Sequence, residues 1–97
     1  MATEITIRHV KLSVALQNAA RKKADKLSQD YPSIENIRVV FDQEGAKYAV
    51  SLAVQGGQAD ATASARDADA TAALNAVFDK AGAQLRRASK KRQETRK

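Results

Sequence analysis

The sequence of 97 residues contains no cysteine and no tryptophan, and it has one histidine, one proline, two tyrosines and two phenylalanines. Without cysteine, disulfides, thiolate metal sites and cysteine nucleophiles are excluded. The start, Met1 to Glu4, has no basic segment followed by an apolar run, so we expect no signal peptide. No apolar run approaches the roughly 18 residues that span a bilayer. These absences predict a soluble, cytoplasmic protein with no membrane association.

The residues that catalysis needs are also scarce. His9 is the only histidine, and no other histidine or cysteine is available to complete a zinc site. Asp67 and Asp69 resemble a catalytic carboxylate pair, but the start of a helix explains them equally well. The pair Gly56-Gly57 lacks the lysine and the helix start of a phosphate-binding loop. We therefore expect no enzyme activity, no metal, no other cofactor and no small-molecule substrate.

The local patterns predict alternating strands and two amphipathic helices. Leu16, Ala20, Ala24 and Leu27 recur at helical spacing in the first helix. A similar stripe in the second helix consists of Leu74, Val77, Phe78, Ala81 and Leu85. The expected elements are a strand over 4–8, a helix from the Ser13 cap to about residue 29, strands over 37–41, 48–54 and about 58–66, and a second helix that begins near Asp67 to Asp69.

The turns follow from glycine and proline. We expect a turn over 42–45, a two-residue hairpin at 55–58, and an end of the first helix at Tyr31-Pro32.

The order of the expected elements is β-α-β-β-β-α, which predicts an α+β fold. It consists of a four-stranded, mainly antiparallel sheet with two helices packed on one face, similar to a double-stranded RNA-binding domain. Residues 1–91 are expected to form the only domain, and residues 92–97 a basic, disordered tail.

Positive charge is in excess and is concentrated near the C-terminus. The chain has 17 lysines and arginines against 11 acidic residues, a net charge of +6, which indicates a polyanionic partner. From Lys80 onward, eight residues are basic and only Glu94 is acidic. Five of the basic residues fall within about 140° of one another on a helix, opposite the apolar stripe: Lys80, Arg86, Arg87, Lys90 and Lys91.

This basic arc repels itself, because like charges four residues apart destabilise a helix by roughly 0.2–0.5 kcal/mol per pair. A phosphate backbone would relieve the repulsion and release counterions. The first helix adds Arg21, Lys22, Lys23 and Lys26. If both helices lie on one face of the sheet, their basic flanks adjoin and form a surface that suits folded RNA. The alternative interpretation is a basic helix that serves solubility alone.

Several runs of the sequence together resemble one family, the short ribosome hibernation-promoting factors, also called ribosome-associated inhibitor or sigma-54 modulation proteins. The runs are Ile5 to Leu16, which includes Arg8-His9, then Lys23-Ala24-Asp25-Lys26-Leu27, Ile37 to Val40, the Gly56-Gly57 turn, and the stretch from Asp79-Lys80 through Gln84-Leu85. The resemblance covers essentially the whole chain.

The resemblance implies a domain that occupies the decoding region of the small ribosomal subunit, blocks messenger and transfer RNA, and keeps idle ribosomes inactive. The expected partners are ribosomal RNA of the small subunit and a separate ribosome-dimerising modulation factor. The expected RNA-binding residues are Arg8, His9, Lys22, Lys23, Lys26, Lys80, Arg86, Arg87, Lys90 and Lys91. Among these, Arg86 and Lys90 are chosen for their charge alone.

The sequence also departs from the family pattern. The tyrosine that usually opens the last helix is absent, and about two extra residues stand in that region, over Asp67 to Asn75. Because the sequence ends in basic residues, we expect neither the acidic tail of the inhibitor type nor the C-terminal domain of the long form. The chain is therefore more similar to the short hibernation-promoting type than to the inhibitor type.

Three other interpretations remain open at this stage. A double-stranded RNA-binding domain shares the α-β-β-β-α order, but it has lysines at the start of its last helix, where this chain has Asp67 and Asp69. A protein-binding regulatory module would use the sheet face away from the helices. That face is expected to carry Arg38, Lys47, Ser51, Thr62 and Ser64. An acylphosphatase-like hydrolase would need a phosphate-binding loop, and none is found.

Overall fold

The computed structural model describes residues 2–8, 10–56 and 60–95, and it describes the side chains of 3–8, 10–56 and 60–87. Six elements follow one another along the chain. They are β1 (Ala2–Ile7), α1 (Val14–Asp30), β2 (Asn36–Glu44), β3 (Lys47–Gln55), β4 (Ala61–Asp67) and α2 (Ala70–Thr95). This is the β-α-β-β-β-α order that the sequence predicts.

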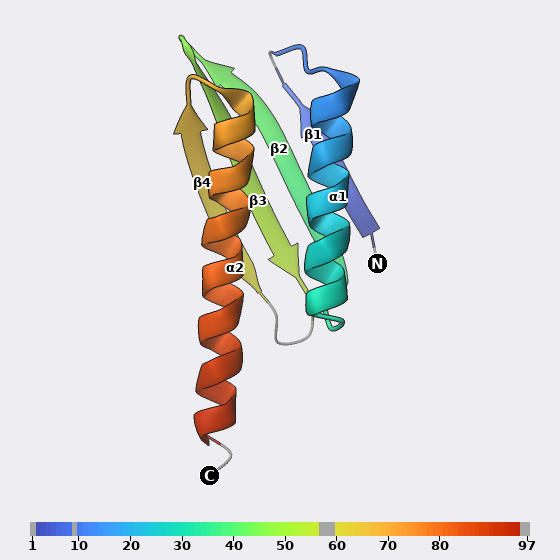
Figure 1. Cartoon of the computed structure of the whole chain (residues 1–97), viewed down its shortest axis with the longest axis vertical. Coiled ribbons are helices and arrows are strands. Elements are labelled where there is room, and N and C mark those ends of the chain that lie inside the picture. The colour runs from blue at the N-terminus through green and yellow to red at the C-terminus, as the bar shows by residue number, and fades with distance from the viewer. Residues whose placement is uncertain (1, 9, 57–59, 96–97) are drawn as a thin grey trace.

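The four strands form one sheet in the order β1-β2-β3-β4. The pair β1/β2 is parallel, and α1 makes the connection between these two strands. The other two pairs are antiparallel, so the sheet is mainly antiparallel, as expected. Both helices lie side by side on the same face of the sheet (Figure 1). They run in the same direction, with the first turn of each at the same end of the molecule.

The core lies between this sheet face and the two helices. Ile37, Val39 and Phe41 alternate along β2 and are buried, because every second residue of a strand points to the same face. The remaining buried strand residues are Val50, Leu52, Val54, Ala61 and Ala65. The buried residues of β4 are alanines, whose short side chains allow α2 to pack closely over β3 and β4. The predicted apolar stripes of both helices face this core.

The ends of α1 agree with the sequence prediction. Ser13 is the N-cap, and its Oγ accepts a hydrogen bond from the Leu16 backbone N–H at 3.1 Å. This satisfies one of the N–H groups that the first turn leaves without an intrahelical partner. The helix ends at Asp30, and the backbone N–H of the C-cap Tyr31 donates to the Leu27 carbonyl. Pro32 follows at once, and it disfavours a helical conformation at Tyr31.

The turns correct two sequence expectations. The predicted turn over 42–45 is mostly strand, because β2 continues to Glu44 and pairs with Lys47. Only Gly45 and Ala46 form the turn, with Gly45 at a φ of +60°. The predicted two-residue hairpin at 55–58 is wrong, because β3 ends at Gln55 and β4 begins at Ala61.

The physical reason for the longer connection lies at Gly56. Its backbone lies directly against the segment Ser33 to Glu35, which connects α1 with β2. The Glu35 N–H donates to the Gln55 carbonyl at 2.8 Å, and the Gly56 N–H donates to the Asp60 carboxylate at 3.3 Å. Gln55 and Gly56 are thus bonded to Glu35 and Asp60, and the first residue of β4 that pairs with β3 is Ala61, opposite Val54.

The start of α2 is set by the aspartates that the sequence points to. The Asp69 carboxylate accepts a hydrogen bond from the Thr71 N–H at 3.0 Å, and Asp67 accepts one from the Asp69 N–H at 2.9 Å. Asp69 is therefore the N-cap, and the helix begins at Ala70.

The backbone of α2 stays helical to Thr95, so no helix end marks the expected domain boundary at residue 91. Residues 83–95 contain neither glycine nor proline, and they are rich in good helix formers.

Replacing Asp69 with alanine is expected to lower the free energy of unfolding by about 1 kcal/mol, because the first turn of α2 loses its capping acceptor. Urea denaturation followed by circular dichroism would measure the change. Replacement with asparagine, which also caps helices well, is expected to restore most of the loss. Equal losses for the alanine and asparagine variants would contradict this role.

Candidate nucleic-acid interface

A groove of about 430 Å³ lies between the C-terminal half of α1 and the middle of α2. The two helices make few contacts with each other. Its residues come from both helices and from the C-cap of α1. They are the basic Lys23, Lys26 and Arg86, the acidic Asp30 and Asp79, the apolar or aromatic Leu27, Tyr31 and Phe78, and Gly82.

The helical repeat explains how these residues come together. On α1, Lys23, Lys26 and Asp30 recur at steps of three and four, which places them along one flank of the helix. On α2, Asp79 and Arg86 lie three residues before and four residues after Gly82, and so share a flank for the same reason. The two flanks face each other across the groove.

The three cations of the groove are available to a ligand. Lys26 and Arg86 are exposed and Lys23 is half-buried. Within the part of the chain whose side chains are described, none of the three takes part in an ion pair. The groove therefore combines three cations that form no ion pair, two carboxylates and an apolar floor.

The basic residues that the sequence predicts along one arc of α2 have different neighbours in the structure. Lys80 lies on the side of β4, where its Nζ donates to the Ser64 carbonyl at 2.9 Å. Gln84, one turn further along, donates its amide to the Thr62 carbonyl at 2.6 Å and accepts from the Thr62 N–H at 3.2 Å. These two side chains cover the open edge of β4, which would otherwise present unpaired backbone groups.

Arg86 lies roughly 120° around α2 from Lys80. It lines the groove with Lys23 and Lys26. Arg87 and Lys22 are exposed outside the groove. Lys80 remains exposed, so it stays accessible although it covers the strand edge.

For three of the predicted RNA-binding residues, the side chain is not among those that the structure describes. His9 lies outside the described residues. Lys90 and Lys91 belong to the helical backbone of α2, but their side chains are outside the described part. This end of α2 extends beyond the sheet (Figure 1).

Arg8 does not line the groove. It is exposed and directly follows β1, and its backbone N–H donates to the Phe41 carbonyl at 2.8 Å. The connection from β1 to α1 lies at the end of the molecule where both helices begin, whereas the groove is formed by the C-terminal half of α1 (Figure 1).

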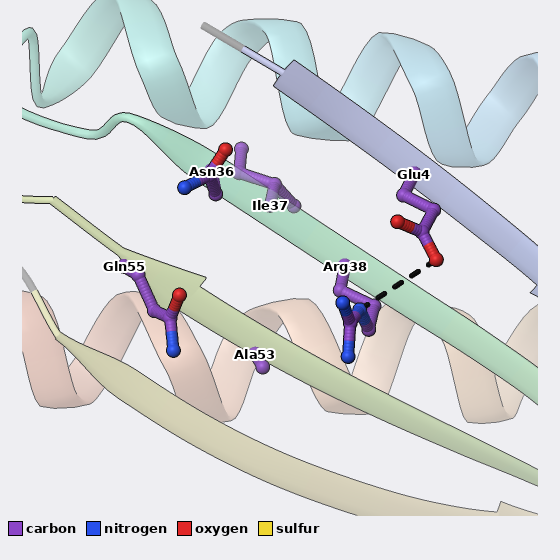
Figure 2. A pocket seen from close by; sticks show the side chains of 6 residues that line it. All are labelled: Glu4, Asn36, Ile37, Arg38, Ala53 and Gln55. Atoms are coloured by element: carbon purple, nitrogen blue, oxygen red, sulfur yellow. Dashed lines mark ion pairs between the residues drawn. The ribbon is translucent and has the colours of Figure 1, made fainter.

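The sheet face away from the helices has a different electrostatic character. A shallow hollow on this face is bordered by Glu4, Arg38, Ala53 and the amides of Asn36 and Gln55 (Figure 2). Arg38 pairs there with Glu4 at 3.7 Å. On the same face Arg66 pairs with Glu44 at 3.2 Å.

The side chains that the sequence predicts for this face are all exposed, namely Arg38, Lys47, Ser51, Thr62 and Ser64. The face is therefore polar, and two of its cations are already beside carboxylates. Such ion pairs are weak in water, but they offset the local charge that would attract a polyanion. The helix face is thus the better candidate for RNA.

Sequence reasoning found the cations of the groove but missed its other residues. The sequence patterns place Phe78 in the apolar stripe alone, and they do not mark Asp30, Asp79 or Gly82 as site residues. The spacing of Asp79, Gly82 and Arg86 on one flank was a usable signal. Which flank faces α1 depends on packing, and it could not be obtained from the pattern.

A metal-ligand cluster and a membrane-spanning helix are two further features that the described residues could form. No group of three or more histidine, cysteine, aspartate or glutamate side chains there could hold a metal ion. Neither helix, over the range described, is long and apolar enough to cross a membrane.

Comparison with known proteins gives one family match and two informative structural neighbours. The profile of the family described as Sigma 54 modulation protein / S30EA ribosomal protein matches residues 3–93. A ribosomal subunit interface protein from Coxiella burnetii is 24% identical, with a TM-score of 0.81 over 90% of this chain and 96% of that chain. The N-terminal domain of Protein Y from Thermus thermophilus is also 24% identical, with a TM-score of 0.74 over 87% and 93%. At this identity the two structures establish the fold. No curated protein matches the sequence.

Proposed function

Because this chain belongs to the sigma 54 modulation protein / S30EA ribosomal protein family, we propose that it is a ribosome hibernation factor. It binds ribosomal RNA of the small subunit in the decoding region, blocks the path of messenger and transfer RNA, and keeps idle ribosomes inactive. It promotes ribosome dimerisation together with a separate modulation factor. Ribosome association also implies a cytoplasmic location.

The observation that carries this proposal is the set of cations on the helix face that form no ion pair among the described residues. Lys23, Lys26 and Arg86 line one groove without an ion pair among the described residues. Arg87 is exposed nearby on α2, and Lys90 and Lys91 follow on the same helix. A cluster of this kind gains affinity for RNA because each neutralised phosphate releases condensed counterions.

A generic double-stranded RNA-binding domain is less well supported. In that module, lysines at the start of the last helix reach phosphates across a groove of the duplex. Here the same position is occupied by Asp67 and Asp69, whose carboxylates bind backbone N–H groups of α2 and its preceding turn. Carboxylates at that end would repel phosphates.

Sedimentation with separated small and large ribosomal subunits, at near-physiological salt and with excess transfer RNA, tests the proposal. We expect the protein to sediment with the small subunit alone, because a specific site survives competition that removes nonspecific binding. Equal sedimentation with both subunits, or complete loss to transfer RNA, would reduce the protein to a nonspecific RNA binder. A complete lack of sedimentation would favour a protein-binding module.

A further inference from the structure

Gly82 occupies a helical position where nothing in the structure requires glycine. It lies in the middle of α2, where glycine is less favourable than alanine. A Cβ atom built there meets only one atom within 4 Å outside the helix backbone and the adjacent residues, Nη1 of Arg86 at 3.6 Å. This is an ordinary van der Waals distance, so neither backbone conformation nor close packing explains the residue.

The position of Gly82 in the groove offers an explanation. It is part of the groove wall on α2, between Asp79 and Arg86 on the same flank. Any larger side chain at this position would project into the space between the two helices. The glycine thus keeps the groove open at a cost in helix stability.

The groove contains carboxylates and an aromatic surface that a site for phosphate alone would not need. Lys23, Lys26 and Arg86 suit phosphates, but Asp30 and Asp79 in the same groove would repel them. Carboxylates accept hydrogen bonds from the exocyclic amino groups of bases. The half-buried Tyr31 adds aromatic surface against which an unstacked base can lie.

We propose that the groove between α1 and α2 binds a single unpaired nucleotide of RNA, and that Gly82 keeps the groove open for its base. The base lies against Tyr31 and Leu27, and its amino group donates to Asp30 or Asp79. Lys23, Lys26 and Arg86 bind the phosphates on either side. This inference rests on the proposed RNA-binding function and specifies which part of the RNA enters the site.

The volume of the groove is consistent with this occupant. At about 430 Å³, it falls in the range of roughly 300–1,000 Å³ that is typical of small-ligand sites. A duplex could contact the cations of the rim but could not insert a paired base. Adenine, cytosine and guanine carry an amino group whereas uracil has none, so the two carboxylates predict weaker binding of uracil.

The test uses the full chain, a six-nucleotide oligo(A), the matching oligo(U) and a short RNA duplex as probes. The variant Gly82→Leu fills the groove, Gly82→Ala adds only a methyl group, and Ala83→Leu adds the same leucine at the adjacent position, which does not line the groove. Affinities come from fluorescence anisotropy, and the binding position from amide shifts in nuclear magnetic resonance spectra.

We expect oligo(A) to bind more tightly than oligo(U) and to shift the amides of Leu27, Tyr31 and Gly82. Gly82→Leu should weaken oligo(A) binding about tenfold, the effect of losing one base–aromatic stack, and leave duplex binding within about twofold. Gly82→Ala should weaken oligo(A) binding by a smaller factor than Gly82→Leu, because its methyl group takes up only part of the space. Ala83→Leu should change oligo(A) binding little. Gly82→Ala should also raise the melting temperature by about 4 °C.

Two results would overturn the inference: unchanged oligo(A) affinity in Gly82→Leu, or amide shifts confined to other elements. Either could occur while the protein still sediments with small subunits, in which case the proposed function stands and only the groove assignment fails. Conversely, oligo(A) binding in the groove without small-subunit binding would support this inference and refute the ribosomal function.

Discussion

Replacing Arg87, Lys90 and Lys91 with alanine is expected to lower the affinity for small ribosomal subunits on the order of 100-fold at about 0.15 M salt. Each lost phosphate contact reduces the slope of log affinity against log salt concentration by roughly 0.7–0.9. Three contacts therefore lower the slope by about 2–3, and the affinity loss at this salt follows from the same slope. Titration with labelled protein at several salt concentrations measures both quantities.

A matched control separates the position of the charge from its amount. Replacing Arg38, Lys47 and Arg66 on the opposite sheet face removes the same three positive charges, but two of these side chains are paired with Glu4 and Glu44. Both triple variants change the net charge from +6 to +3. We expect the control to change affinity less than tenfold. If both variants lose affinity equally, binding depends on overall charge rather than on α2.

Folding of the α2 variant is expected to survive, because the three residues lie beyond Leu85, the last buried side chain of the described core. Their replacement also relieves the repulsion between Arg87 and Lys91, four residues apart on the helix. An unchanged melting temperature would show that any loss of binding reflects lost contacts. A large fall in melting temperature would mean that these residues support the fold.

Replacing Gly56 with alanine is expected to lower the free energy of unfolding by about 3 kcal/mol, the upper end of what overpacking costs. The added Cβ would overlap the Glu35 nitrogen and the Ser33 oxygen, and would lie 2.6 Å from the Ile34 Cα. All three atoms belong to the backbone, so no rotamer change can relieve the contact. For a chain of this length the melting temperature should fall by more than about 10 °C. Thermal and urea denaturation measure the effect.

Gly45 supplies the comparison for this variant. It adopts a φ of +60°, but a Cβ at this position would meet nothing within 4 Å. Replacing it with alanine therefore carries only the strain of the left-handed conformation, about 1–2 kcal/mol. A Gly56→Ala variant no less stable than Gly45→Ala would mean that the connections after β3 and after α1 are not packed as closely as described.

The difference between these two glycines illustrates what can be predicted from a sequence. The turn at Gly45 follows from local chemistry, because a glycine between two alternating strands indicates a tight turn. The pair Gly56-Gly57 gives the same local signal, yet β4 begins only at Ala61. Gly56 is needed because the segment Ser33 to Glu35, distant in sequence, lies against it. No local pattern contains that information.

The same distinction applies to the candidate site. Helical spacing predicted the apolar stripe of α2 and the basic arc opposite to it. It could not separate Lys80, which covers the edge of β4, from Arg86, which lines the groove with Lys23 and Lys26. The angle between two residues on one helix follows from the helical repeat, but the neighbour that each flank meets depends on how the helix is packed.

The sequence by itself determined the order of the elements, the buried face of each helix, the Ser13 cap and the excess of positive charge. These properties depend on residues that are close in the chain, within the reach of one helical turn or one strand repeat. The tertiary structure alone decided that two half-basic helices share a groove, that Asp30 and Asp79 belong to it, and that Gly82 leaves it open. Those properties arise where segments about fifty residues apart pack together, and the relative position of such segments is set by the whole core.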